Sequence, residues 1–301
     1  KFHVSDVVMV VILVILCATC VVPFIHLLAK SVSSNTAVLA KRVSFWPIGF
    51  NLDAYTSIFE DGSMVRSFLY SVIVTLVFTL MGMIACTCAA YPLSRKRLKG
   101  RTFFTFILMF PMYFSAGLIP TYLLYSDLHM LDTVWVLILP LIYAPYNMLI
   151  MKTYFQSNIP DSLEEAAFLD GATNFQIIWK IVLPLSKPIL ATLSLFYAVG
   201  RWNSYADNKY YIRSEGLKMV QYKLSQLVSS ASEAQTAQLS GEVVVTSTPE
   251  VLQAACIMFV TIPIICVYPF LQKYFVKGVM IGAVKADWDS KRFYYKSLRE
   301  L

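Results

Sequence analysis

Six long apolar stretches constrain this chain more than any other feature of its sequence. A helix needs about 20 mostly apolar residues to cross a bilayer, and each stretch is of about that length. The chain of 301 residues is 57% hydrophobic and only 14% charged, whereas soluble domains carry roughly a quarter charged residues. The sequence therefore predicts an all-α polytopic membrane protein with six transmembrane helices. The spans are expected at about 7–29, 68–93, 102–125, 132–154, 185–206 and 252–275.

The orientation of these spans follows from the segment 94–101, which reads SRKRLKGR and has five basic residues and no acidic one. The positive-inside rule places this loop in the cytoplasm. Alternation then places both termini and 155–184 in the cytoplasm, and 30–67, 126–131 and 207–251 outside. The basic residues after the last span agree with this, namely Lys273, Lys277, Lys285, Lys291, Arg292, Lys296 and Arg299. The excess of basic residues thus fits topology, and we expect no nucleic-acid partner.

We expect one transmembrane domain over 1–285, followed by a cytoplasmic tail at 286–301. The first apolar run is too long for a simple signal peptide and lacks a cleavage pattern, so it should remain as a span. Prolines recur inside the spans, and each removes a backbone donor and kinks its helix. Such kinks are either packing irregularities or hinges around a transport cavity. These residues are Pro111, Pro120, Pro140, Pro145, Pro263 and Pro269.

Several kinds of chemistry are absent from the sequence. It has no G-x-x-x-x-G-K-[ST] motif, so the chain should not bind ATP through a P-loop. It also lacks nucleophile-elbow, zincin and Cys–His signatures. The six cysteines lie inside apolar runs, where they are expected as small buried residues rather than metal ligands. The sequence therefore predicts no catalytic residue, no metal site and no cofactor bound by this chain.

The most distinctive stretch runs from Asn158 to Pro188, a charged insertion between two apolar segments. Asp161 with Glu164, or Ser162 with Glu165, can form a capping box that begins a helix. Gly171 then supplies the left-handed position that ends one. The sequence thus predicts a short cytoplasmic helix that stops at a glycine turn.

A second helix is predicted directly after that turn. Thr173 or Asn174 can cap it, and Gln176 completes a capping box with Thr173. Phe175, Ile178, Trp179 and Val182 recur at helical spacing, and Leu183-Pro184 ends or bends the helix. On these signals alone the two helices could equally be an interfacial anchor for the spans.

The spacing within this stretch resembles a known family motif. Glu165-Ala166-Ala167, then Gly171, then Ile181-Val182-Leu183-Pro184 are similar, without a gap, to the EAA loop of binding-protein-dependent ABC import permeases. Asp170-Gly171-Ala172 resembles the form found in carbohydrate-uptake permeases of the maltose and oligosaccharide type. The runs around Trp202-Asn203 and from Lys277 to Lys285 also resemble that family, so the likeness covers nearly the whole chain.

The resemblance implies that this loop is a coupling helix, between the fourth and fifth spans, which sits in a cleft of a separate ATPase subunit. Small alanines would allow close approach, Glu165 would offer a charge to the partner, and Gly171 would set the bend. ATP-driven closure of two ATPase subunits would then rock the spans between inward-open and outward-open states. The implied coupling residues are Glu164, Glu165, Ala166, Ala167, Asp170, Gly171, Ile181, Leu183 and Pro184.

The end of the fifth span offers a candidate substrate path. Aromatic rings can stack on sugar faces, and Asn and Asp offer directional hydrogen bonds. Arg201 could pair with a substrate carboxylate. In the alternative interpretation, Arg201 extends to the outer surface while Trp202 and Tyr205 form an interfacial belt, as Tyr210 and Tyr211 would. The candidate path residues are Arg201, Trp202, Asn203, Tyr205 and Asp207.

These observations predict a multi-pass permease subunit in a bacterial plasma (inner) membrane, which imports an oligosaccharide and is not itself an enzyme. Arg201, Lys209 and Arg213 motivate the hypothesis of an acidic oligosaccharide. The resemblance implies a second homologous permease, two ATPase subunits that bind ATP and Mg, and an extracytoplasmic solute-binding protein. The alternatives are an ABC permease for a non-sugar solute and a polytopic membrane enzyme. An enzyme would need ionisable residues inside its spans, and apart from Arg201 these have almost none.

Overall fold

The computed structural model describes residues 4–239 and 250–266, and these residues are helical with no strand among them. They fall into two units, each of which is described by itself. The terminal unit is formed by the described residues of Lys1–Tyr70 and Lys218–Cys266, and the central unit by Ser71–Leu217. The end of the predicted sixth span, the run from Lys277 to Lys285 and the predicted tail at 286–301 lie outside the described residues.

The terminal unit contains α1 (Val4–Ser31), α2 (Asn35–Leu39), α3 (Asp53–Asp61), the start of α4 (Ser63–Ser94), α14 (Val220–Leu239) and an apolar helix at Glu250–Cys266. Its buried cluster includes Ala29, Val38, Val43 and Val251. The Lys30 ammonium and the Glu250 carboxylate lie 2.5 Å apart and join the end of α1 to the start of the apolar helix. The apolar side chains of α1 from Val7 to Leu16 remain exposed, as expected for a helix that faces lipid.

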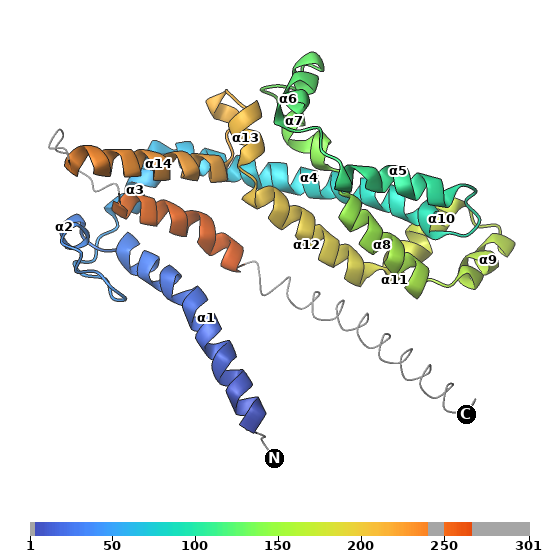
Figure 1. Cartoon of the computed structure of the whole chain (residues 1–301), viewed down its shortest axis with the longest axis horizontal. Coiled ribbons are helices and arrows are strands. Elements are labelled where there is room, and N and C mark those ends of the chain that lie inside the picture. Colours follow the sequence, from blue (N-terminus) through green and yellow to red (C-terminus); the bar gives the residue numbers. More distant parts are fainter. Residues whose placement is uncertain (1–3, 240–249, 267–301) are drawn as a thin grey trace. The chain divides into compact units, whose positions relative to one another are not determined.

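The central unit contains the rest of α4 and the helices up to Leu217, and Figure 1 shows α8 to α11 gathered near the C-terminal end of α4. Its core includes Phe78, Met148, Phe155, Leu193 and Tyr197. The helices are α5 (Arg101–Tyr113), α6 (Leu118–Asp127), α7 (Val134–Ile138), η1 (Leu139–Leu141), α8 (Pro145–Asn158), α9 (Asp161–Leu169), α10 (Asn174–Ile177), the π-helical turn η2 (Ile178–Val182), α11 (Leu183–Leu185), α12 (Lys187–Asn203), α13 (Ala206–Tyr211) and η3 (Glu215–Leu217).

Close packing in this core depends on one glycine of α4. A Cβ added at Gly82 would lie 2.7 Å from Cε1 of Tyr197, too close for any larger residue. The Tyr197 ring also packs edge-on against Phe78, and its hydroxyl donates to the carbonyl of Ile142 at 3.0 Å. Gly82 therefore lets α4 approach α12 closely at this point.

Among the described residues, two helices are long and apolar enough to cross a membrane, Asp6–Ser31 and Ser63–Ser94, and they match the first two predicted spans. Three bent pairs of helices follow. Such bends interrupt the third and fourth predicted spans, whereas the fifth predicted span, at 185–206, corresponds to the continuous helix α12, with a bend at its start. The bends are 113° between α5 and α6, 46° between Val134–Leu141 and α8, and 84° between Asn174–Leu185 and α12. If each bent pair is one span, the described residues contain five.

The breaks have local causes in the sequence. Pro140 lies in η1 and Pro145 begins α8, and a proline cannot donate the hydrogen bond that would continue a helix. At the 113° bend, Gly117 has a φ of +88°, a region that glycine enters without a steric cost. Pro111 lies inside α5, which continues past it to Tyr113. Pro184 and Pro188 likewise lie on either side of the 84° bend. Prolines therefore mark two of the breaks, whereas a glycine segment makes the sharpest.

Candidate functional site

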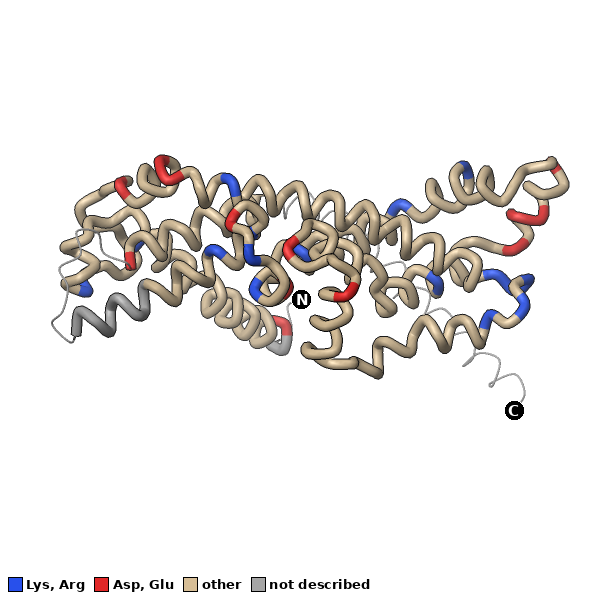
Figure 2. The backbone as a smooth tube through the Cα atoms, turned by 90° about the horizontal axis from the view of Figure 1, so that it is seen from above, with Lys and Arg blue, Asp and Glu red and all other residues tan. Residues whose placement is uncertain are grey.

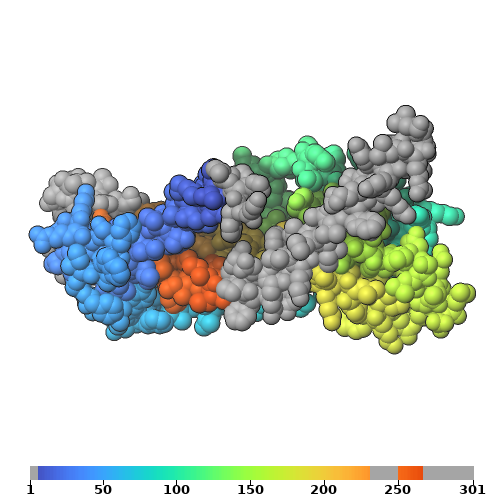
Figure 3. Space-filling view, turned by 90° about the horizontal axis from the view of Figure 1, so that it is seen from below, coloured from blue at the N-terminus to red at the C-terminus, as the bar shows by residue number. Residues whose placement is uncertain are grey.

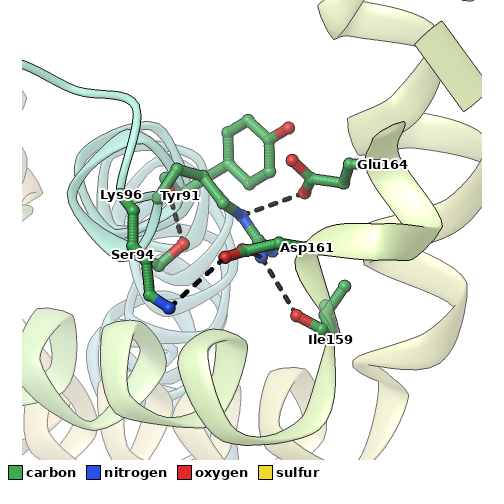
Figure 4. Close-up of polar contacts among 7 residues, drawn as sticks. Tyr91, Ser94, Lys96, Ile159, Asp161 and Glu164 are labelled. Carbon is green, nitrogen blue, oxygen red and sulfur yellow. Dashed lines mark hydrogen bonds and ion pairs between the residues drawn. The ribbon is translucent and has the colours of Figure 1, made fainter. Parts of the chain in front are cut away.

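The helix α9 begins in a way that differs from the sequence prediction. Its N-cap is Pro160, and no side chain caps its first turn. The predicted capping boxes, Asp161 with Glu164 and Ser162 with Glu165, are therefore wrong. The carboxylates of Asp161 and Glu164 point instead toward the end of α4 (Figure 4).

The end of α9 follows the predicted glycine turn. Gly171 has a φ of +80°, and its amide donates to the carbonyl of Phe168 at 3.0 Å. The amide of Ala172 donates to the carbonyl of Ala167 at 2.9 Å. This pair of bonds is a Schellman motif, which satisfies the last carbonyls of α9 and turns the chain sharply.

The second helix starts with the capping box that the sequence predicts. The backbone N–H of Gln176 donates to the hydroxyl of Thr173 at 3.3 Å, and the backbone N–H of Thr173 donates to the side-chain oxygen of Gln176 at 2.8 Å. The helix then runs from Asn174 to Leu185, with a π-helical turn at Ile178–Val182. Ile177 and Val182 are buried in the core of the central unit.

A buried arginine joins α9 to α4. Arg95 directly follows α4. Its Nε lies 2.9 Å from Oε1 of Glu164, and the two side chains are only 4% and 5% exposed. Nη1 of Arg95 also donates to the carbonyl of Ile159 at 3.0 Å, and lies 3.4 Å from a carboxylate oxygen of Asp161. The guanidinium carbon sits 5.3 Å from the centre of the Tyr91 ring. One side chain thus contacts α4, the end of α8 and the first turn of α9.

The basic loop after α4 makes a second contact with this region. Nη2 of Arg97 donates to the side-chain oxygen of Asn174 at 2.7 Å, and its guanidinium carbon lies 4.6 Å from the centre of the Phe168 ring. Figure 2 shows the basic loop in blue near the acidic residues of α9 in red. The loop that the sequence marks only as a topology signal therefore also fixes both helices of the Asn158–Pro188 stretch.

The outer face of this helix pair is exposed, and its atoms form part of the surface of the central unit in Figure 3. Leu169 is 89% exposed at the tip of α9. Phe175 and Trp179 are also exposed, and their rings stack with centres 6.3 Å apart and planes 11° apart. Three large apolar side chains that point away from their own unit mark a surface suited to another protein.

The predicted coupling residues divide into two groups. Glu164 and Ala167 are buried, and Ile181 and Leu183 are half-buried, so these side chains hold the helices on the core. The exposed group consists of Glu165, Ala166, Asp170, Gly171 and Pro184. Sequence reasoning missed Arg95 and the exposed pair of Phe175 and Trp179. The apolar period at Phe175 and Trp179 was a signal, but it could not tell an exposed face from a buried one.

The structure contradicts the interpretation in which Arg201 extends to the outer surface. Arg201 is only 1% exposed, so its side chain does not reach the outer surface. Nη2 lies 2.8 Å from a carboxylate oxygen of Asp207, and Nη1 donates to the carbonyl of Leu137 at 2.8 Å. The hydroxyl of Ser204 donates to the same carboxylate oxygen at 2.9 Å. Arg201 therefore fastens the start of α13 to α12 and α7, and its charge is already paired.

The other candidate path residues vary in exposure. Asp207 is half-buried and paired with Arg201, and Trp202 is half-buried. Asn203 and Tyr205 are exposed. The structure thus leaves Asn203 and Tyr205 accessible, whereas Arg201 and Asp207 form an internal pair.

A cluster of tyrosines lies beside this end of α12, and the sequence did not bring its members together. The ring of Tyr211 is 6.2 Å from that of Tyr122 and 5.1 Å from that of Tyr125. Nη2 of Arg213 donates to the hydroxyl of Tyr122 at 3.2 Å. We call these four residues the tyrosine–arginine cluster. Its members come from α6, α13 and the loop after α13, so spacing along the chain gives no signal for it.

Asp132 fixes that loop. Its carboxylate accepts hydrogen bonds from the hydroxyl of Ser214 at 2.6 Å, and from the amides of Ser214 at 2.8 Å and Arg213 at 2.9 Å. The hydrogen bonds from Ser214, followed by that from Arg213, lower the pKa of Asp132 below its ordinary value. The backbone of Asp132 has a φ of +56°, a conformation that Asp and Asn tolerate better than most residues.

Known proteins match this chain over most of its length. Residues 79–281 match the family described as the binding-protein-dependent transport system inner membrane component. The chain is 42% identical over 269 residues to the polygalacturonan/rhamnogalacturonan transport system permease protein YtcP of Bacillus subtilis, covering 88% of this chain and 93% of that one. It is 38% identical over 270 residues to the protein LplC of the same organism, covering 89% and 90%.

A solved structure is also similar. It is the crystal structure of a bacterial ABC transporter involved in the import of the acidic polysaccharide alginate, with a TM-score of 0.83 and 34% sequence identity. The likeness covers 91% of this chain and 99% of that one.

Together, the apolar helices and the similarity to transport permeases place this chain among membrane-embedded transport subunits rather than enzymes. The chain belongs to the family of binding-protein-dependent transport system inner membrane components, the permeases of ABC transporters. The prediction made from the EAA-like spacing is therefore confirmed at the level of the family.

Proposed function

We propose that this chain is a permease subunit of an ATP-driven importer and that its α9–α11 segment is the surface moved by the ATPase. The carrying observation is that α9 is anchored from inside by the Arg95–Glu164 pair while Glu165, Ala166 and Leu169 stay exposed. A force applied to the exposed face would pass through the buried pair to α4. The coupling residues keep the roles assigned from the resemblance, with Glu164 and Ala167 as anchors.

The proposed topology has six spans with both termini in the cytoplasm of a bacterial plasma membrane. The basic loop after α4 supports this orientation, because its five basic residues favour the cytoplasmic side. The loop also contacts the exposed helix pair, which would therefore lie on the same side. The partners would be a second homologous permease, two ATPase subunits that bind ATP and Mg, and an extracytoplasmic solute-binding protein. The chain itself would bind no cofactor.

The cargo we propose is an oligosaccharide, and specifically an acidic one. One relative is named for polygalacturonan and the similar structure for the acidic polysaccharide alginate. Because Arg201 is already paired with Asp207, we assign the substrate carboxylate to other cations. The exposed Arg213 and Lys209 are better placed, because the first borders the rings of the tyrosine–arginine cluster and the second lies 5.8 Å from the centre of the Tyr210 ring. Rings beside cations suit a sugar that carries a carboxylate.

The coupling proposal is tested by purifying the chain with its candidate ATPase from cells that express both. Glu165→Lys should release the ATPase and abolish transport, whereas Glu60→Lys should not, although it makes the same charge change at an exposed residue of α3. Copurification and ATP-driven uptake in proteoliposomes are the measurements. Retention of the ATPase and full uptake in Glu165→Lys would refute the proposed coupling surface.

A further inference from the structure

A basic pocket between α5 and α8 is not used by the coupling surface or by the candidate substrate path. It has a volume of about 370 Å³. Four of its lining residues come from the first two turns of α5, and two come from the second half of α8. The lining residues are Arg101, Thr102, Thr105, Phe106, Lys152 and Gln156.

The pocket has two cations and no carboxylate among its lining residues. The ammonium of Lys152 donates to the hydroxyl of Thr105 at 3.1 Å, and that hydroxyl donates to the carbonyl of Arg101 at 2.7 Å. Lys152 is thereby held in the wall of the pocket with further N–H groups to donate. None of the ion pairs found in the described ranges uses Arg101 or Lys152.

The position of Arg101 adds to the unbalanced charge. It is the first residue of α5, a helix of 13 residues whose N-cap Gly100 provides no side-chain acceptor. The start of a helix carries a partial positive charge, so a cation there is unfavourable unless an anion is near. Arg101 and Lys152 therefore form a site that an anionic group would stabilise.

One wall of the pocket is apolar and continues along α5. Phe106 lines the pocket and is 70% exposed. Phe103, Ile107 and Phe110 are also exposed, and they lie three or four residues apart along the same helix. A stripe of exposed apolar side chains that leads away from two cations matches a molecule with an anionic head and hydrocarbon tails.

The geometry points to an anionic phospholipid as the occupant, with its phosphate between Arg101 and Lys152 and its acyl chains along the apolar stripe of α5. A soluble phosphate compound would satisfy the two cations but would leave the stripe unused. Basic pockets between helices at the cytoplasmic face are known to hold anionic head groups. The inference rests on the proposed topology, which places the segment 94–101, and with it this pocket, at the cytoplasmic leaflet.

The test uses the complete transporter purified in detergent and stripped of lipid. Dioleoylphosphatidylglycerol and dioleoylphosphatidylcholine are titrated separately, and bound lipid is counted by native mass spectrometry. The anionic lipid should bind more tightly than the zwitterionic one. Lys152→Gln and Arg101→Gln should each weaken its binding about fivefold, the contribution expected of one cation near lipid. Lys152→Arg should keep the binding.

The matched control is Lys99→Gln, which removes one positive charge from an exposed residue of the same loop outside the pocket lining. It should leave the lipid affinity unchanged. Equal weakening by Lys99→Gln and Lys152→Gln would overturn the site in favour of a diffuse charge effect. Binding of glycerol 3-phosphate as tightly as of the lipid would overturn the lipid assignment.

Another protein subunit is the alternative to lipid as the molecule that covers the apolar stripe of α5. A photo-crosslinking residue in place of Phe106 distinguishes the two. Crosslinks to lipid support the inference, and crosslinks to a permease or ATPase chain overturn it. Failure here can be told from failure of the proposed function, because uptake and its loss in Glu165→Lys are measured without reference to lipid. The lipid site can therefore be refuted without refuting the coupling surface, and the coupling surface can be refuted without refuting the lipid site.

Discussion

Arg95 and Glu164 form a buried ion pair, with 2.9 Å between Nε and Oε1, that joins the end of α4 to α9. Glu165, the next residue along α9, is exposed. Adjacent glutamates thus differ sharply in their surroundings, and only the first is part of the interior. Because a buried charge is stable only when paired, the position of α9 on α4 is set by this contact. The contact gives a structural reason why motion of the exposed face would reach the spans.

Glu164→Gln should destabilise the chain strongly. It leaves the Arg95 guanidinium buried without its closest carboxylate, and removing one partner of a buried pair costs about 3–5 kcal/mol. The exposed Asp161, whose carboxylate is 3.4 Å from Nη1 of Arg95, should reduce the loss toward the lower end of that range. Thermal unfolding of the purified transporter would show a clear fall in the midpoint.

Glu165→Gln is the matched control, because it makes the same chemical change one residue further along α9. It should change the free energy of unfolding by no more than about 0.5 kcal/mol, while weakening ATPase binding. The double variant Arg95→Met with Glu164→Leu should recover part of the stability lost in Glu164→Gln, since a well-packed apolar pair can replace a buried ion pair. Equal midpoints for the two single Gln variants would contradict the anchoring role of Glu164.

Gly171→Ala should impair the turn between α9 and α10. The φ of +80° at Gly171 costs a residue with a Cβ about 1–2 kcal/mol, although no neighbouring atom lies within 4 Å of that Cβ. The penalty is therefore conformational rather than steric. Gly200→Ala provides the comparison, because Gly200 lies within α12 with equally open space around it. That change should be neutral or stabilising by about 0.5–1 kcal/mol. Unfolding midpoints that fall equally for both would rule out the turn as the cause.

Arg213→Gln should affect acidic sugars more than neutral ones. If Arg213 pairs with a substrate carboxylate, its loss should raise the KM for uptake of an oligouronide about tenfold, as expected for one charge-assisted hydrogen bond. Uptake of a neutral oligosaccharide of equal length should change little. Arg66→Gln, which removes a charge from an exposed residue of α4, should alter neither.

Arg201→Ala distinguishes a substrate ligand from a structural residue. Because Arg201 is buried against Asp207 and the Leu137 carbonyl, its removal should lower the unfolding midpoint and reduce uptake of acidic and neutral sugars alike. A selective loss of acidic-sugar uptake in Arg201→Ala, with normal stability, would return the substrate carboxylate to Arg201.

Sequence patterns predict the local features of this fold, because these features depend on residues that are close together in the sequence. The apolar runs predict the helices of α1 and α4, and Thr173 with Gln176 predicts a capping box that the structure contains. Gly171 predicts the turn after α9 for the same reason. Prolines inside the spans and Leu183-Pro184 predicted bends, but the sharpest bend, at Gly117, was not predicted. A proline or glycine permits a break, whereas tertiary packing decides how sharply the helix turns.

The candidate site was predicted only in part because its main contacts are distant in the sequence. Asp161 and Glu164 could cap their own helix by spacing alone, yet Arg95, the residue after α4, takes both carboxylates. Arg201 shows the same limit, because its partner Asp207 lies across the bend between α12 and α13 and no motif marks the pair. A charge in a pattern shows that a partner is needed, whereas the fold determines which partner it finds.

Asp132→Asn should weaken the tether between the α6–α7 loop and the segment after α13. Asn tolerates the φ of +56° found at this position, so the backbone is preserved while the charge that accepts three hydrogen bonds is lost. Because these bonds lower the pKa of Asp132 in the folded chain, its contribution to stability is fully present above the ordinary value of 3.8 and is lost as the pH falls through the lower folded value. The unfolding midpoint of Asp132→Asn should therefore lie below that of the starting protein by the same amount at pH 7 and pH 5. A difference that shrinks between pH 7 and pH 5 would contradict the lowered pKa, and an unchanged midpoint at pH 7 would show that the tether does not stabilise the fold.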